Sequence, residues 1–189
     1  MKRIDLSGGT DRERWVNVEN SWGAKNPLRT KIAAKHIPAG SRVLDLGAGT
    51  MLLKGFLSED CHYQPCDLHS RSPECIVADF NNDEFPIEKH YDWVTLIGLF
   101  QFLTDPMSLL KKCNQVASHA VVTYSPIIHS QLTEKELLWR RGEGWNNHFT
   151  LDEYVAIVRN SGWEIIKAYR VPANVILICR NNNESGQHG

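Results

Sequence analysis

The chain has 189 residues and nearly balanced charge, with 21 Lys and Arg against 22 Asp and Glu for a formal net charge of −1. By the usual size prior this length forms one domain, which can bury about 70% of the surface exposed by the unfolded chain. The balanced charge offers no overall attraction to nucleic acid or to an anionic membrane. No apolar run approaches the ~18 residues of a membrane helix, and the amino terminus lacks the apolar core of a signal peptide.

The chain begins with a polar stretch, residues 1–27, which we expect to form a lid or cover. It contains two tryptophans, Trp15 and Trp22. A helix is expected from about residue 27 to residue 36. A Pro-Ala-Gly turn then ends that helix and leads the chain into the first strand.

Residues 42–57 have the layout of a loop that binds a nucleotide-type cofactor. Arg42 to Leu46 predict a short buried strand. Gly47 and Gly49 then allow the backbone to turn tightly and to approach a ligand without obstruction by a Cβ atom. An amphipathic helix is expected to follow, with three apolar residues: Met51, Leu52 and Phe56.

Two details of this loop distinguish between cofactors. Leu52 occupies the place where the pyrophosphate fingerprint of dinucleotide-binding proteins has a third glycine. Asp45 puts a carboxylate at the end of the strand, where it would repel a pyrophosphate and attract a positively charged cofactor. S-adenosylmethionine carries a sulfonium and an ammonium group and no phosphate, so the electrostatics favour it.

The next two strands are each predicted to end in an acidic residue. The strand from His62 to Cys66 is followed by Asp67, eighteen residues after Gly49, which suits a carboxylate that accepts both hydroxyls of a ribose. A third strand over residues 75–78 is followed by Asp79 and Phe80. An acid and an aromatic side chain at a strand end suit an adenine ring.

The second half continues the alternation of strands and helices. A fourth strand is expected over residues 91–97, and a helix from Pro106 to about Val116, capped by Asp105. A fifth strand follows over residues 120–124. A capping box at Thr150 begins another helix.

The last two strands are expected over residues 163–170 and 174–179. Their short connection requires them to be antiparallel neighbours. The tail, residues 181–189, is polar and is expected to be mobile. The whole pattern predicts an α/β fold with a doubly wound, mostly parallel, Rossmann-like seven-stranded sheet and an antiparallel C-terminal hairpin strand.

The chain resembles class I S-adenosylmethionine-dependent methyltransferases over about residues 28–180. The segments that carry the resemblance are Val43–Thr50, Asp67, Ala78–Phe80 and Asp92–Leu99. The resemblance implies a single methyltransferase domain, residues 1–180, that uses S-adenosyl-L-methionine to methylate a small molecule.

The resemblance also implies a role for each strand end. The glycine loop would contact the methionine part of the cofactor, Asp67 the ribose, and Asp79 with Phe80 the adenine. The backbone after the fourth strand would hold the methionine ammonium, with Arg29 near its carboxylate. The full implied set is Asp45, Gly47, Ala48, Gly49, Asp67, Leu68, Asp79, Phe80, Ile97, Gly98 and Arg29.

Two features beside this set have open interpretations. In one interpretation Trp15 and Trp22 fold over the cofactor, as amino-terminal segments do in similar enzymes. In the other interpretation they only cover the sheet. Gln101-Phe102 stands where many small-molecule methyltransferases have a Glu-His or Glu-Tyr pair, so the role of that pair does not carry over.

The segment 125–149 is an insert that the core fold does not require. It follows the fifth strand, so it is expected to lie over the cofactor site as a substrate wall, with a short helix over residues 134–141. A solvated loop with paired charges is the alternative. The expected acceptor-binding residues are Tyr124, Arg140, Arg141, Trp145 and Asn147. The paired arginines favour an anionic acceptor.

Methyl transfer requires an acceptor held close to the methyl group, and a base assists when the acceptor is a hydroxyl or an ammonium. His148 is the first candidate for that base and His129 the second. Neither an acid at Ile97 or Gly98 nor an Asn/Asp-Pro-Pro-Tyr/Phe segment is present, which leaves metal-independent O- or N-methylation of a small molecule.

The sequence also allows other interpretations of function and of the cysteines. A methyltransferase-like subunit that binds the cofactor and regulates or positions a partner is the alternative function. A nucleotide-cofactor oxidoreductase is disfavoured by Asp45 and Leu52. A zinc site built from Cys61, His62, Cys66 and Cys75 is disfavoured because no Cys-x-x-Cys pair is present. The five cysteines are instead expected to be reduced, in a cytoplasmic protein without nucleic-acid or membrane partners.

Overall fold

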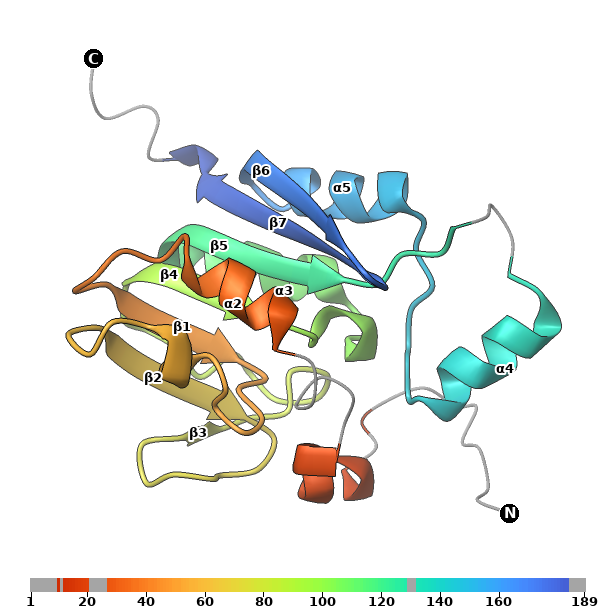
Figure 1. Cartoon of the computed structure of the whole chain (residues 1–189), viewed down its shortest axis with the longest axis horizontal. Helices are drawn as coiled ribbons and strands as arrows, with labels where there is room; N and C mark the ends of the chain where they lie inside the picture. The colour runs from red at the N-terminus through yellow and green to blue at the C-terminus, as the bar shows by residue number, and fades with distance from the viewer. Residues whose placement is uncertain (1–9, 11, 21–26, 129–131, 184–189) are drawn as a thin grey trace.

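The computed structural model describes residues 10, 12–20, 27–128 and 132–183, which fold around one sheet (Figure 1). The strands are β1 (Arg42–Leu46), β2 (His62–Asp67), β3 (Ile76–Val77), β4 (Tyr91–Leu96), β5 (Ala117–Tyr124), β6 (Trp163–Val171) and β7 (Asn174–Asn181). Their order is β3-β2-β1-β4-β5-β7-β6. Neighbours among β1 to β5 are parallel, whereas β7 is antiparallel to both β5 and β6. The predicted fold class is confirmed.

Helical segments occupy the connections between the strands. They are η1 (Glu13–Asn20), α2 (Leu28–Ala34), η2 (Lys54–Phe56), η3 (Phe100–Phe102), α3 (Pro106–Val116), α4 (Glu134–Gly142) and α5 (Leu151–Asn160). The η segments are 3-10 helices.

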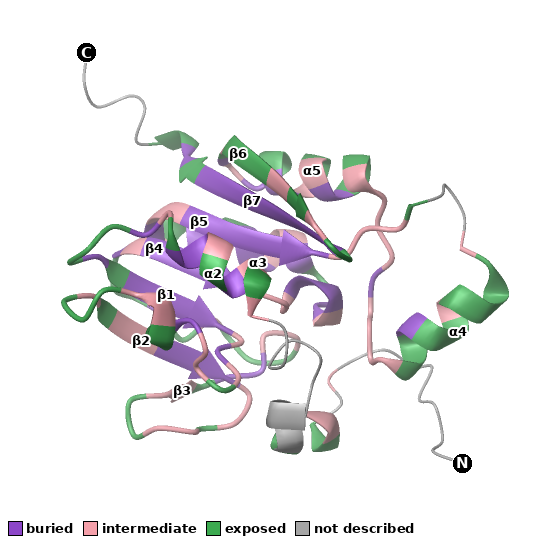
Figure 2. Cartoon of the chain, viewed as in Figure 1, coloured by how far each residue is buried: buried purple, intermediate pink, exposed green. Residues whose placement is uncertain are grey.

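The sheet buries side chains on both faces, which produces two apolar cores (Figure 2). Helices α3 and α5 cover one face, where Leu110 and Tyr154 pack with Leu96. Helix α2 covers the other face, where Ala33 packs with Val43. Because side chains of a strand alternate between faces, neighbouring residues of β1 contribute to opposite cores.

The ends of the helices follow local hydrogen bonding that the sequence predicts. Asp105 accepts a hydrogen bond from the backbone N–H of Ser108 at 3.0 Å and so caps α3, which has Pro106 as its first residue. Thr150 and Glu153 form the predicted capping box of α5. Such caps satisfy N–H groups that have no partner within the helix.

The prediction of an amphipathic helix after Gly49 is wrong. The segment forms turns and only the three-residue η2. Met51 has φ of 56°, outside the helical region, and Gly55 lies where a longer helix would need a better helix former.

Several strand boundaries also differ from the prediction. Strand β3 has two residues rather than four, and β5 begins at Ala117 rather than at Ala120. Strand β7 continues to Asn181, inside the expected tail, because Asn181 pairs with Trp163 and donates to the carbonyl of Ala117 at 3.0 Å.

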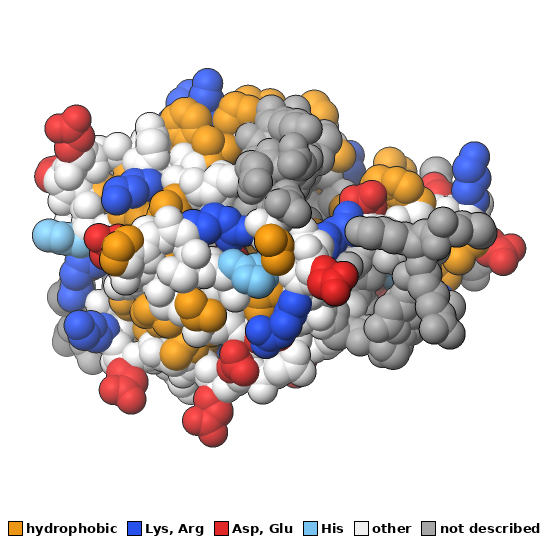
Figure 3. Space-filling view, turned by 90° about the horizontal axis from the view of Figure 1, so that it is seen from below, with side chains coloured by type: hydrophobic (Ala, Val, Ile, Leu, Met, Phe, Trp, Pro, Cys, Tyr) orange, Lys and Arg blue, Asp and Glu red, His pale blue; other side chains and the backbone are white. Residues whose placement is uncertain are grey.

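Helix α4 stands apart from the sheet in Figure 1 and is mostly exposed in Figure 2. Within the described ranges, no helix has the length and apolar character needed to cross a membrane. Acidic and basic side chains lie interspersed over the described part of the face shown in Figure 3.

Candidate functional site

A cavity that is open to solvent lies where β1, β2, β3 and β4 end. Seven residues of the predicted cofactor set line it: Gly47, Gly49, Asp67, Leu68, Asp79, Phe80 and Gly98. Other lining residues, which the sequence analysis did not assign to the site, include Thr10, Asn81, Leu99, Phe102, Leu103 and Gly144. The carboxyl ends of parallel strands are the usual ligand-binding edge of such a sheet.

The glycine loop forms a tight turn at the end of β1. Gly47 and Gly49 have φ of 72° and 54°, a region that glycine adopts without a steric penalty. The backbone N–H of Gly47 donates to the carbonyl of Cys66 at 2.8 Å, which ties the turn to β2. A Cβ atom on Gly47 would lie 3.2 Å from Leu99 and narrow the cavity.

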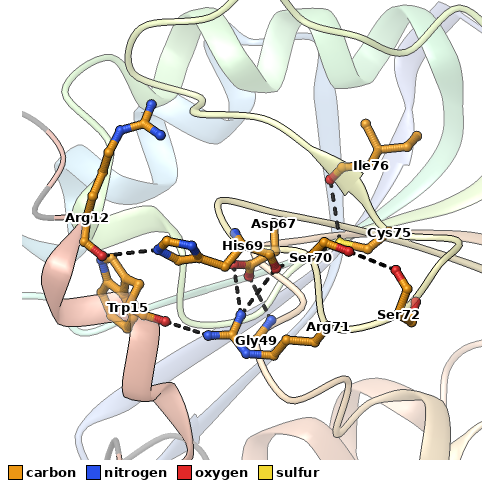
Figure 4. A network of polar contacts seen from close by, with 10 residues as sticks. All are labelled: Arg12, Trp15, Gly49, Asp67, His69, Ser70, Arg71, Ser72, Cys75 and Ile76. Carbon is orange, nitrogen blue, oxygen red and sulfur yellow. Dashed lines mark hydrogen bonds and ion pairs between the residues drawn. The ribbon is translucent and has the colours of Figure 1, made fainter.

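Asp67 is buried at the end of β2, and backbone donors orient its carboxylate (Figure 4). One oxygen accepts from the backbone N–H of Gly49 at 2.7 Å. The other accepts from the N–H of His69 at 3.2 Å and from Arg71 at 3.4 Å. Each carboxylate oxygen has more than one lone pair, so the residue keeps acceptor capacity toward the cavity.

Asp79 is buried after β3 and receives donors from the amino-terminal segment. Thr10 donates to it at 2.6 Å and Arg12 at 3.1 Å. Burial alone would raise the pKa of Asp79, but the hydrogen bonds from Thr10 and Asn82 and the charge of Arg12 hold it below its usual value. The carboxylate therefore stays ionised.

Residues of the amino-terminal segment also line the cavity. Trp15 in η1 lines the cavity, and its ring meets Phe102 edge-on with the centroids 4.5 Å apart. Arg71 donates to the backbone carbonyl of Trp15, as Figure 4 shows. Arg14 forms an ion pair with Glu143 at 2.7 Å, next to α4. Trp22 lies outside the described residues.

Gly98, after β4, lies against Arg29. Its φ is 80°, and a Cβ atom at this position would collide with the guanidinium of Arg29. The N–H of Gly98 donates to Thr123 at 2.8 Å, and Arg29 donates to Asn174 at 3.4 Å. Burial lowers the pKa of Arg29, although an arginine still remains charged at physiological pH.

Four members of the predicted cofactor set do not line the cavity: Asp45, Ala48, Ile97 and Arg29. Asp45 is only 3% exposed, and its two oxygens accept from the hydroxyls of Tyr63 at 2.6 Å and Thr95 at 2.5 Å. Burial raises the pKa of Asp45 to about 6, and the two hydroxyls offset part of that effect.

The predicted acceptor residues cluster at the base of α4, outside the lining of the cavity. Tyr124 is fully buried and accepts from the backbone N–H of Phe149 at 2.7 Å. Asn147 donates to the carbonyls of Phe100 and Leu103 at 2.8 and 3.0 Å. These two side chains fix the course of residues 147–149 over η3.

The charged members of the insert have different environments. Arg140 is 7% exposed, donates to the carbonyl of Ser125 at 3.1 Å and stacks over the ring of Trp145 at 4.7 Å, whereas Arg141 is exposed. Burial, followed by the charges of Arg140 and Arg141, lowers the pKa of His148. His129 lies outside the described residues.

No protein-family profile matches the sequence, and no curated protein matches it. Solved structures do match the fold. An O-methyltransferase family 2 protein from Planctomyces limnophilus in complex with apigenin has a TM-score of 0.67 at 11% identity, over 93% of this chain and 63% of its own. A SAM-dependent methyltransferase from Aquifex aeolicus has a TM-score of 0.64 at 13% identity, over 90% of this chain and 98% of its own.

A third match is CalO1, a methyltransferase in calicheamicin biosynthesis, in its SAH-bound form. Its TM-score is 0.63 at 15% identity, over 89% of this chain and 56% of its own. The present chain thus spans less than two thirds of the length of CalO1 and of the Planctomyces protein. At these identities the matches establish a shared fold. The chain has the fold of class I S-adenosylmethionine-dependent methyltransferases.

Proposed function

We propose that the protein binds S-adenosylmethionine in this cavity and transfers its methyl group to an oxygen or nitrogen atom of a small-molecule acceptor. The observation that carries the proposal is the convergence of a glycine turn, two buried carboxylates and Gly98 on one cavity. These groups come from the ends of four different strands. Hydrogen-bond acceptors at two successive strand ends are not needed for the stability of the sheet, and this supports a role in binding a ligand.

The lining residues suit the parts of this cofactor. Asp67 accepts the ribose hydroxyls, and Asp79 with Phe80 binds the adenine edge and one ring face. Because Gly47 has no Cβ atom, the turn leaves space for the methionine part of the cofactor beside the backbone. Arg29, which lies behind Gly98, attracts the carboxylate of that methionine part. S-adenosylmethionine supplies a methyl group already activated by the adjacent sulfonium.

The charges of the cavity argue against a dinucleotide. Asp67 and Asp79 both line it, and the buried Asp45 lies behind the glycine turn. Asp67 and Asp79 are ion-paired with Arg71 and Arg12, and an acid at the position of Asp67 also suits the ribose of a dinucleotide. The charge that would repel a pyrophosphate is therefore that of Asp45. The same carboxylates are compatible with a cofactor that carries positive charge and no phosphate.

The acceptor is a small molecule that enters beside Gly144, where the insert reaches the cavity. The apigenin and calicheamicin-pathway relatives support this class of acceptor. Arg140 and Arg141 would attract an anionic group of the acceptor. The domain would act with residues 1–27 as a lid and 125–149 as the acceptor wall.

His148 is the proposed general base for a hydroxyl or ammonium acceptor. Its lowered pKa keeps the imidazole neutral, and therefore able to accept a proton, at physiological pH. Its Nδ1 atom is buried and has no hydrogen-bond partner among the described residues. His148 does not itself line the cavity, and the buried Nδ1 is not an atom that an acceptor in the cavity would meet, so the support for this role is the neutral state of the ring.

The test combines binding and turnover. Calorimetry should detect binding of S-adenosylmethionine and of its demethylated product S-adenosylhomocysteine, and none of NAD. Incubation with methyl-labelled S-adenosylmethionine and fractionated cell metabolites should then transfer label to a small molecule. Binding without any transfer would favour a regulatory subunit over an enzyme. Absence of binding would reject the proposal.

A further inference from the structure

Asp45 is a buried anion that the contacts of the fold leave without a cation. Both of its oxygens accept from neutral hydroxyls, those of Tyr63 and Thr95. Among the described residues, no Lys, Arg or His lies within ion-pair distance of it. An ionised carboxylate without a cationic partner is costly to bury, so the position requires an explanation beyond packing.

The position of Asp45 is next to the predicted methionine end of the cavity. It lies two residues before Gly47, which lines the cavity, and pairs across the sheet with Thr95 of β4. The side chain itself does not reach the cavity lining. Asp45 can therefore act on a bound ligand through its charge but not through a direct contact.

We propose that Asp45 makes the site prefer the positively charged S-adenosylmethionine over its neutral product S-adenosylhomocysteine. This inference rests on the proposed function. The two ligands share adenine, ribose, ammonium and carboxylate groups and differ in the methyl group and in the charge of the sulfur. A fixed negative charge behind the glycine turn attracts the sulfonium and leaves the thioether unaffected. The enzyme would thus release its product more readily than it releases its substrate.

Protonation of Asp45 gives this preference a dependence on pH. Burial raises its pKa to about 6, with the charge of Asp67 adding to the effect. The titratable groups around it are Tyr63, Cys66 and Asp67, all on β2. Burial raises the pKa values of Tyr63 and Cys66, so both stay neutral near pH 6. Asp45 therefore changes charge near pH 6, whereas Tyr63 and Cys66 do not.

The first test uses the unaltered protein and needs no substitution. Calorimetric titrations at pH 6 in buffers of different ionisation enthalpy measure the protons released on binding. S-adenosylmethionine should release up to about half a proton more than S-adenosylhomocysteine, since about half of the Asp45 carboxyls are protonated at that pH and the sulfonium favours the ionised form. Equal proton release by the two ligands would overturn the inference.

The second test compares Asp45→Asn with a matched carboxylate-to-amide change, Asp79→Asn, at pH 7.5. Asp45→Asn should weaken S-adenosylmethionine about tenfold more than it weakens S-adenosylhomocysteine, because both ligands lose the attraction on the ammonium and only S-adenosylmethionine also loses the attraction on the sulfonium. Asp79→Asn should weaken both ligands by a similar factor, because adenine is common to them. Equal effects of Asp45→Asn on both ligands would reject the role of Asp45. Failure of both ligands to bind the unaltered protein would instead reject the proposed function.

Discussion

The buried carboxylate at Asp45 should destabilise the folded protein at neutral pH, and Asp45→Asn should relieve that effect. The pKa of the carboxyl rises from an ordinary 3.8 to about 6 on folding, mainly because of burial. The folded state therefore binds this proton more tightly than the unfolded state does. The protonated carboxyl therefore contributes stability that is fully present below pH 3.8 and is lost as the pH rises through 6, where the carboxyl ionises in the folded state.

The size of the loss follows from the pKa change. At about 1.4 kcal/mol per pH unit, the difference between 3.8 and about 6 corresponds to about 3 kcal/mol in the free energy of unfolding. Asparagine stays neutral at every pH and has nearly the same shape. The variant should gain stability relative to the unaltered protein between pH 4 and pH 8, by up to about 3 kcal/mol.

Urea unfolding at several pH values between 4 and 8 measures this gain. Asp92→Asn is a suitable control, because its effect on the free energy of unfolding at neutral pH should have the opposite sign. Burial would raise the pKa of Asp92, but its hydrogen bonds and ion pair with Arg42 lower it. Its stabilising contribution is therefore present at neutral pH and is lost as the pH falls. If the difference in stability between Asp45→Asn and the unaltered protein is the same at all pH values, the reasoning on Asp45 is wrong.

Three further substitutions test other parts of the site. Gly98→Ala should lower the free energy of unfolding by about 1–3 kcal/mol in urea titrations, because φ is 80° and the methyl group meets Arg29, whereas Gly55→Ala, with open space around it, should not. Arg71→Ala should speed proteolytic cleavage of the amino-terminal segment by releasing Trp15, while Arg180→Ala at an exposed ion pair leaves the cleavage rate unchanged. His148→Ala should reduce turnover roughly 100-fold with unchanged cofactor affinity and melting temperature, and unaltered turnover should fall at acid pH as the imidazole protonates; a fully active variant would remove His148 from the mechanism.

The arrangement of the strands could be predicted from the sequence because the signals are local. A short strand-like run followed by a glycine or an acid marks the end of a predicted strand, and this pattern recurs after Leu46, Cys66 and Ala78. Since parallel strands end at the same edge, three local signals were enough to bring Gly47, Asp67 and Asp79 together.

Contacts between distant segments could not be predicted in the same way. Thr10 and Arg12 reach Asp79 across 69 and 67 residues, and no periodic pattern in the sequence encodes that pairing. The missed turn after Gly49 has a different cause. Its apolar residues suggested a helix, but a segment this short with Gly55 inside it gains too few hydrogen bonds to propagate one.

The insert shows the limit of residue chemistry as a guide. Aromatic, amide and guanidinium groups in residues 124–148 suggested an acceptor pocket. In the structure Tyr124, the amide nitrogen of Asn147 and one guanidinium nitrogen of Arg140 form hydrogen bonds with backbone groups, whereas Asn147 Oδ1 and Arg140 Nη1 are buried without a hydrogen-bond partner among the described residues. Residue types alone could not predict these backbone contacts, and the role of the insert in binding an acceptor stays a prediction.

Binding of S-adenosylmethionine to the unaltered protein and to Asp67→Ala, measured by calorimetry beside NAD, tests the central claim most directly. The unaltered protein should bind S-adenosylmethionine and not NAD. Asp67→Ala should weaken binding by about 1–3 kcal/mol, roughly tenfold or more, because the ribose hydroxyls lose their acceptor. Tight binding of NAD, or an unchanged dissociation constant for S-adenosylmethionine in Asp67→Ala, would contradict the account.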